Sequence, residues 1–168
     1  MASSKESRKR GMPDAVTDTA LRGFLGYHLR LASRAVLGDL ARALQPFGLR
    51  MVTFTALRLI AGNPGMRQSQ LARALSVERS NLVQIVDELE RQGLIRREQM
   101  PSDRRSYSLR ATPEGERLNG AALRAVEAHE ARIFGAVPDE DRKRFAEILA
   151  LVRRRADEGK DADGGSSG

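Results

Sequence analysis

Residues 68–112 read QSQLARALSVERSNLVQIVDELERQGLIRREQMPSDRRSYSLRAT, and this stretch decides the fold. Its first half contains two runs with helical apolar periodicity, and its second half contains two strand-like runs around a basic turn. The helical runs match the spacing of a helix-turn-helix, whose start, buried small residue, turn and two apolar anchors fall on Gln68, Ala72, Ser76, Leu82 and Ile85. The turn position usually carries glycine because its backbone favours a positive φ, so Ser76 departs from the pattern. We interpret this stretch as a DNA-reading element.

The composition favours a helical chain with a polyanionic partner. The 168 residues are 40% hydrophobic but only 4% aromatic, so aliphatic side chains must fill the core. The formal net charge of +7 indicates nucleic acid as a partner, with an acidic membrane surface as the alternative. Nearly all the basic residues are arginine, which suits bidentate recognition of phosphate and guanine, although a biased genome composition produces the same enrichment.

Several classes of protein are disfavoured by what the sequence lacks. There is no cysteine, which removes structural disulfides, thiolate metal sites and thiol-based redox sensing. No apolar run approaches the roughly 18 residues that a membrane span needs. The N-terminus is charged and lacks the apolar segment of a signal peptide. We therefore expect a cytoplasmic protein without a membrane partner.

Helical patterns flank the opening stretch on both sides. They are predicted over residues 18–44 and 51–61 before it, and over 113–134 and 138–157 after it. Thr17 or Asp18 is expected to cap the first of these helices, and Thr112 to cap the third, with Pro113 at its first position. Residues 1–17 are polar and basic, and residues 158–168 are of low complexity, so both are expected to be disordered tails.

Within the opening stretch, we expect helices over residues 68–75 and 79–92 and a β-hairpin over 94–99 and 105–110. The turn of this hairpin is predicted at residues 100–104, which contain the turn formers proline, serine and aspartate. The second helix of the pair would bury one apolar face and leave a polar row opposite, formed by Ser80, Gln84, Asp87 and Arg91, with Asn81 on the flank.

This order of elements, with the segments DRR at 103–105 and TPEG at 112–115, resembles the MarR family of bacterial winged-helix transcriptional regulators. The resemblance covers about residues 21–152. It implies a mainly α fold with a small β-hairpin wing, a DNA-binding lobe over about 51–112, and dimerisation helices over about 18–48 and 113–157 of a single domain at 18–157. Three helix starts depart from the family pattern, because Arg50, Arg67 and Glu78 stand where a serine or threonine cap is common.

The resemblance also implies how DNA is read. In a homodimer, the two recognition helices would enter successive major grooves of a pseudo-palindromic operator. Base edges would be read by Ser80, Asn81 and Gln84, and phosphates would be held by Ser69, Arg73 and Arg79. At the wing, Arg104 or Arg105 would enter the minor groove while Asp103 orients an arginine. The alternative for the polar row is a helix face that is only solvated, and the alternative for the hairpin tip is an ordinary charged turn.

A small aromatic or anionic effector is the expected third partner. The GYHLR segment at residues 26–30 resembles relatives that control aromatic-acid catabolism, including those that sense hydroxycinnamoyl-CoA thioesters. His28 is the leading candidate contact, with a hydrogen-bonded histidine at a buried interface as the alternative reading. The remaining candidates are an aromatic wall and an anion partner formed by Phe47, Phe54 and Arg58.

An enzyme is the rival class, and the sequence disfavours it. His28 and His129 are the only histidines, and neither a glycine-rich phosphate loop nor a catalytic constellation accompanies them. Two distant histidines do not form a metal site, so neither metal nor cofactor is expected. His129 lies in a polar stretch and is predicted to be exposed. The expected function is an effector-released repressor, and the alternative is an architectural DNA-binding protein without an effector.

Overall fold

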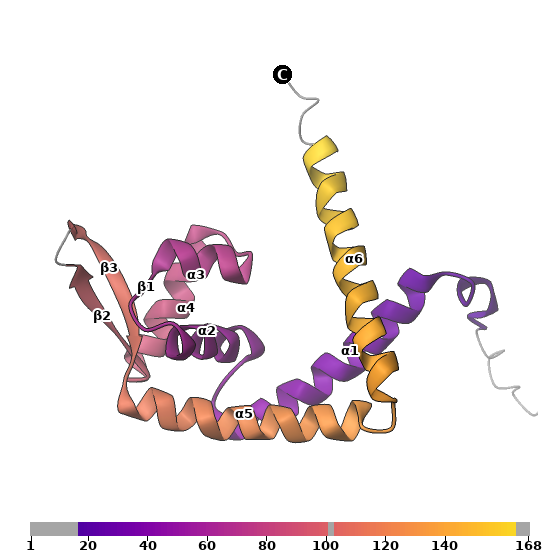
Figure 1. The fold of residues 1–168 in the computed structure, drawn as a ribbon, viewed down its shortest axis with the longest axis horizontal. Coiled ribbons are helices and arrows are strands. Elements are labelled where there is room, and N and C mark those ends of the chain that lie inside the picture. Colours follow the sequence, from indigo (N-terminus) through magenta and orange to yellow (C-terminus); the bar gives the residue numbers. More distant parts are fainter. Residues whose placement is uncertain (1–16, 101–102, 164–168) are drawn as a thin grey trace, which may run out of the picture. The chain divides into compact units, whose positions relative to one another are not determined.

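The computed structural model describes the backbone of residues 17–100 and 103–163, and the side chains of residues 17–99 and 107–159. The chain divides into two compact units, Met1–Leu37 and Gly38–Gly168, which are described separately. The elements shown in Figure 1 are η1 (Thr19–Leu21), α1 (Leu25–Leu44), η2 (Gln45–Phe47), α2 (Met51–Gly62), β1 (Met66–Arg67), α3 (Gln68–Leu75), α4 (Arg79–Arg91), β2 (Ile95–Met100), β3 (Asp103–Ala111), α5 (Pro113–Phe134) and α6 (Asp139–Asp163). The expected fold class, mainly α with a small β-hairpin wing, is confirmed.

The sheet has three antiparallel strands in the order β1-β3-β2. The predicted hairpin forms β2 and β3, with Ile95 opposite Ala111. The short strand β1 was not predicted, because two residues are too few to show the alternation that identifies a strand. It pairs Met66 with Leu109 and so attaches the segment between α2 and α3 to the base of the hairpin.

Two helix starts without a hydroxyl cap are held from inside the helix. The backbone N–H of Arg50 donates to Thr53 Oγ1 at 2.9 Å, and the backbone N–H of Arg67 donates to Gln70 Oε1 at 2.7 Å. In both cases the third helical residue reaches back to the capping position, which is one half of a capping box. This interaction explains how α2 and α3 begin where sequence alone made their starts uncertain.

The helix-turn-helix has the turn that its spacing predicts. Ser76 adopts the left-handed conformation (φ 52°, ψ 44°) directly after α3, and it is the one non-glycine residue with positive φ in the described chain. The next N–H, of Val77, donates to the carbonyl of Ala72 at 3.1 Å and closes the end of the helix. Serine therefore occupies a position where glycine would be relaxed.

The first helix begins later than its apolar pattern predicts. α1 starts at Leu25 rather than at residue 18, because residues 19–21 form a separate 3-10 turn and Gly23 follows it. Asp18 does not cap a helix through its side chain. Its carboxylate accepts instead from Tyr27 Oη at 2.7 Å and from Arg22 Nε at 2.8 Å, which folds this segment back onto the first turn of α1.

The last helix is longer than predicted. α6 continues to Asp163, so residues 158–163 are helical and do not belong to a tail that begins at 158. Gly159 is the single poor helix former among them, and one interior glycine costs only about 1 kcal/mol relative to alanine. The expected disorder of residues 1–16 and 164–168 concerns positions outside the described residues.

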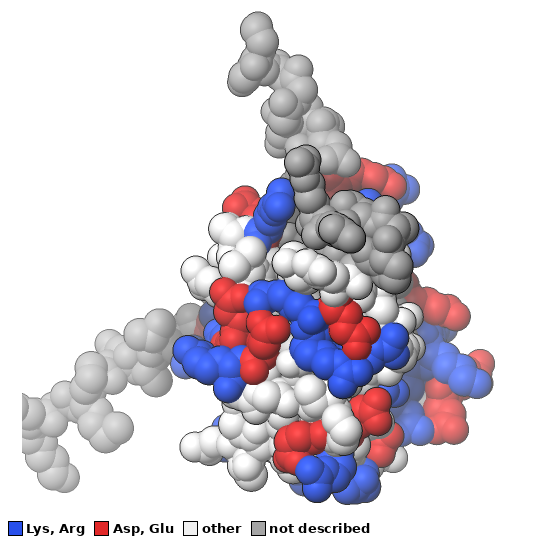
Figure 2. Space-filling model, turned by 90° about the vertical axis from the view of Figure 1, so that its left-hand side faces the viewer, with Lys and Arg blue, Asp and Glu red and all other residues white. Residues whose placement is uncertain are grey.

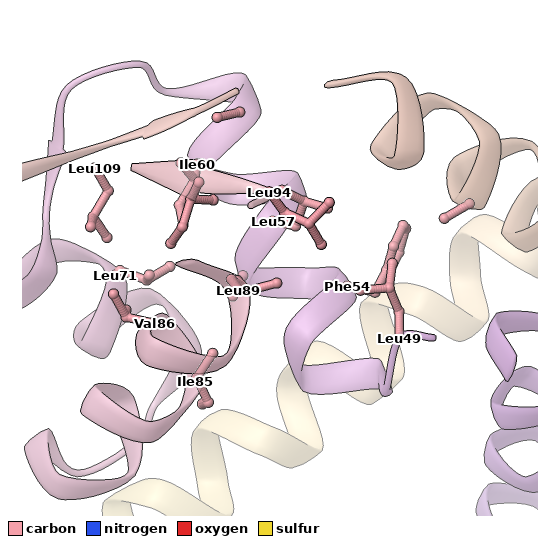
Figure 3. Close-up of a cluster of buried hydrophobic side chains, with 14 of the residues drawn as sticks. Leu49, Phe54, Leu57, Ile60, Leu71, Ile85, Val86, Leu89, Leu94 and Leu109 are labelled. Carbon is pink, nitrogen blue, oxygen red and sulfur yellow. The ribbon is translucent and has the colours of Figure 1, made fainter. Parts of the chain in front are cut away.

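The hydrophobic core lies under the helix-turn-helix and the base of the sheet. α2 packs against α3, α4, α5 and β3. Figure 3 shows Leu57 and Ile60 of α2 pointing toward side chains of α3, α4 and β3, including Leu71, Leu89 and Leu109. All five of these side chains are fully buried. The core thereby fixes the orientation of the two helices that sequence assigns to DNA reading.

The TPEG segment docks α5 against the turn that leads into β2. Thr112 Oγ1 accepts from the backbone N–H of Gly115 at 3.0 Å and donates to the carbonyl of Gly93 at 2.7 Å. A Cβ atom on Gly115 would lie 1.9 Å from the carbonyl oxygen of Leu94, so only glycine fits at this contact. Thr112 therefore caps α5 as predicted, and the same hydroxyl attaches the helix start to the segment before β2.

His129 is buried, with 2% of its surface exposed, and the expectation that it is exposed was wrong. It occupies the inner face of α5, where Nε2 lies 3.3 Å from Oδ2 of Asp39. Glu127 and Glu130, its acidic neighbours in the sequence, are exposed, whereas Arg132 lies about one turn away and pairs with the same Asp39 oxygen. Helical periodicity, rather than the polarity of the local segment, decides the environment of His129.

Candidate nucleic-acid interface

The DNA-reading side chains predicted on the two helices all lie on the exposed surface of α3 and α4. These are Ser69, Arg73, Arg79, Ser80, Asn81 and Gln84. Buried Leu82, Ile85, Val86 and Leu89 anchor the opposite face of α4. Both Arg73 and Arg79 are exposed, and neither forms an ion pair with any residue that the structure describes.

The three acidic residues of α4 each meet an arginine from another element. Arg97 of β2 forms ion pairs with both Asp87 and Glu90, and its backbone N–H donates to Glu90 Oε1 at 3.3 Å. Arg50, directly before α2, forms an ion pair with Glu88. These arginine partners were not foreseen, because strand alternation shows that Arg96 and Arg97 face opposite sides of the sheet but not which helix covers each side.

A second cluster occupies the other side of the sheet. Arg96 and Arg110 lie directly opposite one another on β2 and β3, and Glu98 accepts from Arg96 Nε at 2.7 Å and from Arg110 Nε at 3.1 Å. The hydrogen bonds from Arg96 and Arg110 hold the pKa of the Glu98 carboxyl below its ordinary value. On the face drawn in Figure 2, basic and acidic side chains touch one another rather than forming a patch of one sign.

The DRR segment lies at the start of β3, with Asp103 paired to Met100 across the hairpin. β2 extends to Met100 and β3 starts at Asp103, so residues 100, 103 and 104 of the predicted turn belong to strands, and residues 101–102 lie outside the described residues. The side chains of Asp103, Arg104 and Arg105 lie outside the described residues, and so does the expected salt bridge of Asp103.

The four effector candidates have different environments. Phe54 belongs to the hydrophobic core with 9% of its surface exposed, Phe47 packs half-buried against that core, and Arg58 is exposed. None of these three lines the cavity of about 220 Å³ that is formed by Ile60, Ala61, Pro64, Arg96, Arg110, Ala111, Pro113 and Glu116.

His28, the fourth candidate, belongs to the unit Met1–Leu37. It is exposed, and its Nε2 atom donates to the carbonyl of Arg22 at 2.8 Å. Beside His28, the pKa of Asp18 is lowered, first by the hydrogen bond from Tyr27 and second by the one from Arg22. The hydrogen bond between Tyr27 and Asp18 also raises the pKa of Tyr27. The Arg30 guanidinium lies 5.4 Å from the centre of the Tyr27 ring. The sequence did not predict Asp18 as the hydrogen-bond partner of Tyr27 and Arg22, because Asp18 was assigned to a helix cap.

Two other kinds of site are absent from the described residues. Among them, no three or more histidine, cysteine, aspartate or glutamate side chains come together in a way that would hold a metal ion. No helix in the same part of the chain is long and apolar enough to cross a membrane.

Comparison with known proteins identifies the family. Residues 49–107 match the model of the MarR family. The chain is 34% identical over 140 residues to a transcriptional regulatory protein described for the hcr operon of Thauera aromatica, covering 83% of this chain and 84% of that protein. The chain belongs to the MarR family. MarR proteins are transcriptional regulators rather than enzymes, which confirms the class predicted from the sequence.

Solved structures of MarR regulators show the same fold. The repressor CouR bound to a 23-mer DNA duplex superposes with a TM-score of 0.78 at 32% identity, covering 83% of this chain and 99% of that one. CouR from Rhodococcus jostii RHA1 bound to p-coumaroyl-CoA superposes with a TM-score of 0.71 at 34% identity, covering 80% of this chain and 95% of that one.

Proposed function

We propose that this MarR protein is a homodimeric repressor that binds a pseudo-palindromic operator and is released by the CoA thioester of an aromatic acid. One observation carries the proposal. The row of exposed polar residues on α3 and α4 is held rigidly by a buried core, and its arginines, Arg73 and Arg79, are left without ion pairs in the described chain. The likeness to CouR, solved with a DNA duplex and with p-coumaroyl-CoA, supports both halves of the proposal.

The roles on the DNA follow from side-chain chemistry. Asn81 and Gln84 each offer a donor and an acceptor, which suits bidentate pairing with adenine, and Ser80 serves either kind of edge. Arg79, Ser69 and Arg73 bind phosphates and set the register of the helix on the duplex. Arg104 or Arg105 enters the minor groove at the wing, where the negative potential is strongest in narrow segments, and Asp103 orients an arginine.

Dimerisation is supported by apolar surface that the single chain leaves uncovered. On α1, Leu25 is 86% exposed, and Leu29, Leu31 and Leu37 are exposed as well. On α6, Phe145, Ile148, Leu149, Leu151 and Val152 are all exposed. An amphipathic helix buries its apolar stripe in a stable fold, so helices with uncovered stripes need a partner. A second copy of the chain meets that need and matches a two-fold operator.

The effector contacts are proposed at His28, Phe47, Phe54 and Arg58. Phe47 and Arg58 present surface to a ligand, whereas Phe54 offers only the edge that the core leaves exposed. In the exposed imidazole of His28, Nε2 donates to the carbonyl of Arg22, and the other nitrogen, which has no partner among the described residues, can accept a hydrogen bond. A thioester that binds the released state more tightly than the DNA-bound state shifts the population away from the operator.

The DNA half is tested by selecting bound duplexes from a random library and measuring affinity by fluorescence anisotropy. Asn81→Ala with Gln84→Ala should lower affinity for the selected operator by about 1–3 kcal/mol per lost base contact and weaken discrimination against a scrambled duplex. Arg104→Ala with Arg105→Ala should weaken binding to both duplexes and flatten the salt dependence. Equal affinity of the unaltered protein for operator and scrambled DNA would support the architectural alternative.

The effector half is tested by adding p-coumaroyl-CoA, p-coumarate or free CoA to the protein–operator complex. Release by the thioester alone is expected, and His28→Ala or Arg58→Ala should raise the concentration needed without changing affinity for DNA. Failure of all three compounds to release the operator would contradict the proposed effector class. Sedimentation of the free protein checks the dimer, and a monomer at micromolar concentration would contradict the two-fold arrangement.

A further inference from the structure

The recognition helix α4 carries more acid than base. Its sequence RSNLVQIVDELER contains two arginines and three acids, which gives the isolated helix a net charge of −1. An element that approaches DNA phosphates with a negative charge is repelled by them. Some other part of the chain must offset the acids if α4 is the reading element.

Asp87 is the acid whose position would cause the strongest repulsion of DNA phosphates. Residues 80, 84, 87 and 91 recur at helical spacing and therefore share one face of α4, which is the face that carries Ser80 and Gln84. The Asp87 side chain is 56% exposed there. Glu90 lies on one flank of the same face and Glu88 on the other, at the side of Asn81. The acids thus lie within about two helical turns of Gln84, on the same face of α4 or on its flanks.

Arg97 of β2 reaches both Asp87 and Glu90 with one guanidinium group. Its Nη2 atom pairs with Asp87 Oδ1 and its Nη1 atom pairs with Glu90 Oε2. Only 24% of the Arg97 side chain is exposed, so the group is held between strand and helix rather than extended into solvent. A planar guanidinium with fixed donors suits such double pairing better than a lysine ammonium does.

We propose that Arg97 is a positioning residue for DNA binding whose single positive charge offsets part of the negative charge of Asp87 and Glu90 on the reading face of α4. On the opposite flank, the positive charge of Arg50 offsets the negative charge of Glu88. With both arginines in place, α4 and its partners carry a net positive charge toward the phosphates. The inference rests on the proposed function, since it assumes that α4 reads DNA.

The test separates charge neutralisation from a purely mechanical clamp. Arg97→Gln removes one positive charge from beside two carboxylates and should weaken operator binding by about fivefold, the effect of one charge pair a few ångströms apart in water. The triple variant Arg97→Gln, Asp87→Asn, Glu90→Gln should bind within about twofold of the unaltered protein, because the repelling charges are gone. The double variant Asp87→Asn, Glu90→Gln should bind at least as tightly as the unaltered protein.

The matched control is Arg117→Gln, which removes the same charge from an exposed ion pair with Glu114 on α5. It should leave operator affinity unchanged. A double variant that binds as weakly as Arg97→Gln would overturn the proposal in favour of a mechanical clamp, and so would equal effects of Arg97→Gln and Arg117→Gln. If Arg97→Gln does not fold by circular dichroism, the comparison of the triple and double variants decides the question alone. Absence of DNA binding by the unaltered protein would instead reject the proposed function.

Discussion

Asp39 Oδ2 lies 3.3 Å from Nε2 of His129, and this contact joins the end of α1 to the buried face of α5. The two groups are close enough for an ion pair but are not aligned for a hydrogen bond, so both ring nitrogens lack a hydrogen-bond partner within the described residues. Asp39 also pairs with Arg132 and Arg42. The hydrogen bond from Arg132, opposed in part by burial, lowers the pKa of this carboxyl.

The first prediction concerns the pH dependence of this cluster. Because the pKa of Asp39 is lowered in the folded state, its stabilisation is present above the unfolded value of about 4 and is lost as pH falls through the lower folded value. Asp39→Asn should lower the free energy of unfolding at pH 7, and the deficit should shrink below about pH 4. Urea titrations at both pH values measure it.

The control for Asp39 is Glu127→Gln on the exposed side of α5, where no ion pair forms with the described residues. This variant should change stability little at either pH. A deficit for Asp39→Asn that stays constant from pH 7 to pH 3 would contradict the proposed linkage.

The second prediction concerns Glu98 at the base of the wing. Arg96 and Arg110 face one another across the hairpin, and like charges at such a pair destabilise a sheet unless they are offset. Glu98→Gln should therefore lower the thermal midpoint, and it should do so less in a background with Arg96→Gln. Equal losses in the two backgrounds would show that Glu98 does not act through this pair.

The third prediction compares two glycines of α5. Gly115→Ala places a Cβ atom against the Leu94 carbonyl and should destabilise the fold by at least about 1–3 kcal/mol. Gly120→Ala meets nothing closer than 3.8 Å, the end of the Arg124 side chain. It should stabilise the helix by about 0.5–1 kcal/mol. Chemical denaturation of both variants checks the difference, and effects of the same sign would refute the packing argument.

The fourth prediction concerns the turn of the helix-turn-helix. Ser76→Gly should raise the free energy of unfolding by up to about 1 kcal/mol, because glycine adopts the left-handed conformation without a steric penalty. Ser76→Val should lower it, since a β-branched side chain resists that conformation. Thermal unfolding is the measurement, and a loss of stability in Ser76→Gly would mean that the Ser76 hydroxyl matters more than its backbone.

The sequence predicts those parts of the fold whose residues repeat at a helical or strand period. α2, α3, α4 and the hairpin start and end within about two residues of their predicted bounds, because each has a buried stripe and a defined break. Contacts between distant segments carry no such period. Neither the pairing of β1 with β3 nor the burial of His129 against Asp39 can be read from neighbours in the chain.

The candidate site shows the same division. The exposure of Ser80, Asn81 and Gln84 follows from the periodicity of α4 alone, and the structure agrees with it. The pairing of Arg97 with Asp87 and Glu90 depends on which face of the sheet meets α4, and this is a tertiary property. The exposed polar residues of one helix are thus easier to predict from sequence than their ion-pair partners on another element.

Thr53 and Gln70 hold the starts of α2 and α3 from inside each helix, and this has an evolutionary consequence. A helix start secured in this way no longer depends on a hydroxyl at the residue before it. That residue is released from selection for capping, and mutation can then recruit it for another purpose. Arg50 stands at such a position, and its side chain forms an ion pair with Glu88 of α4. A change at the residue before such a helix can therefore alter the charge beside α4 without removing the interaction that starts the helix.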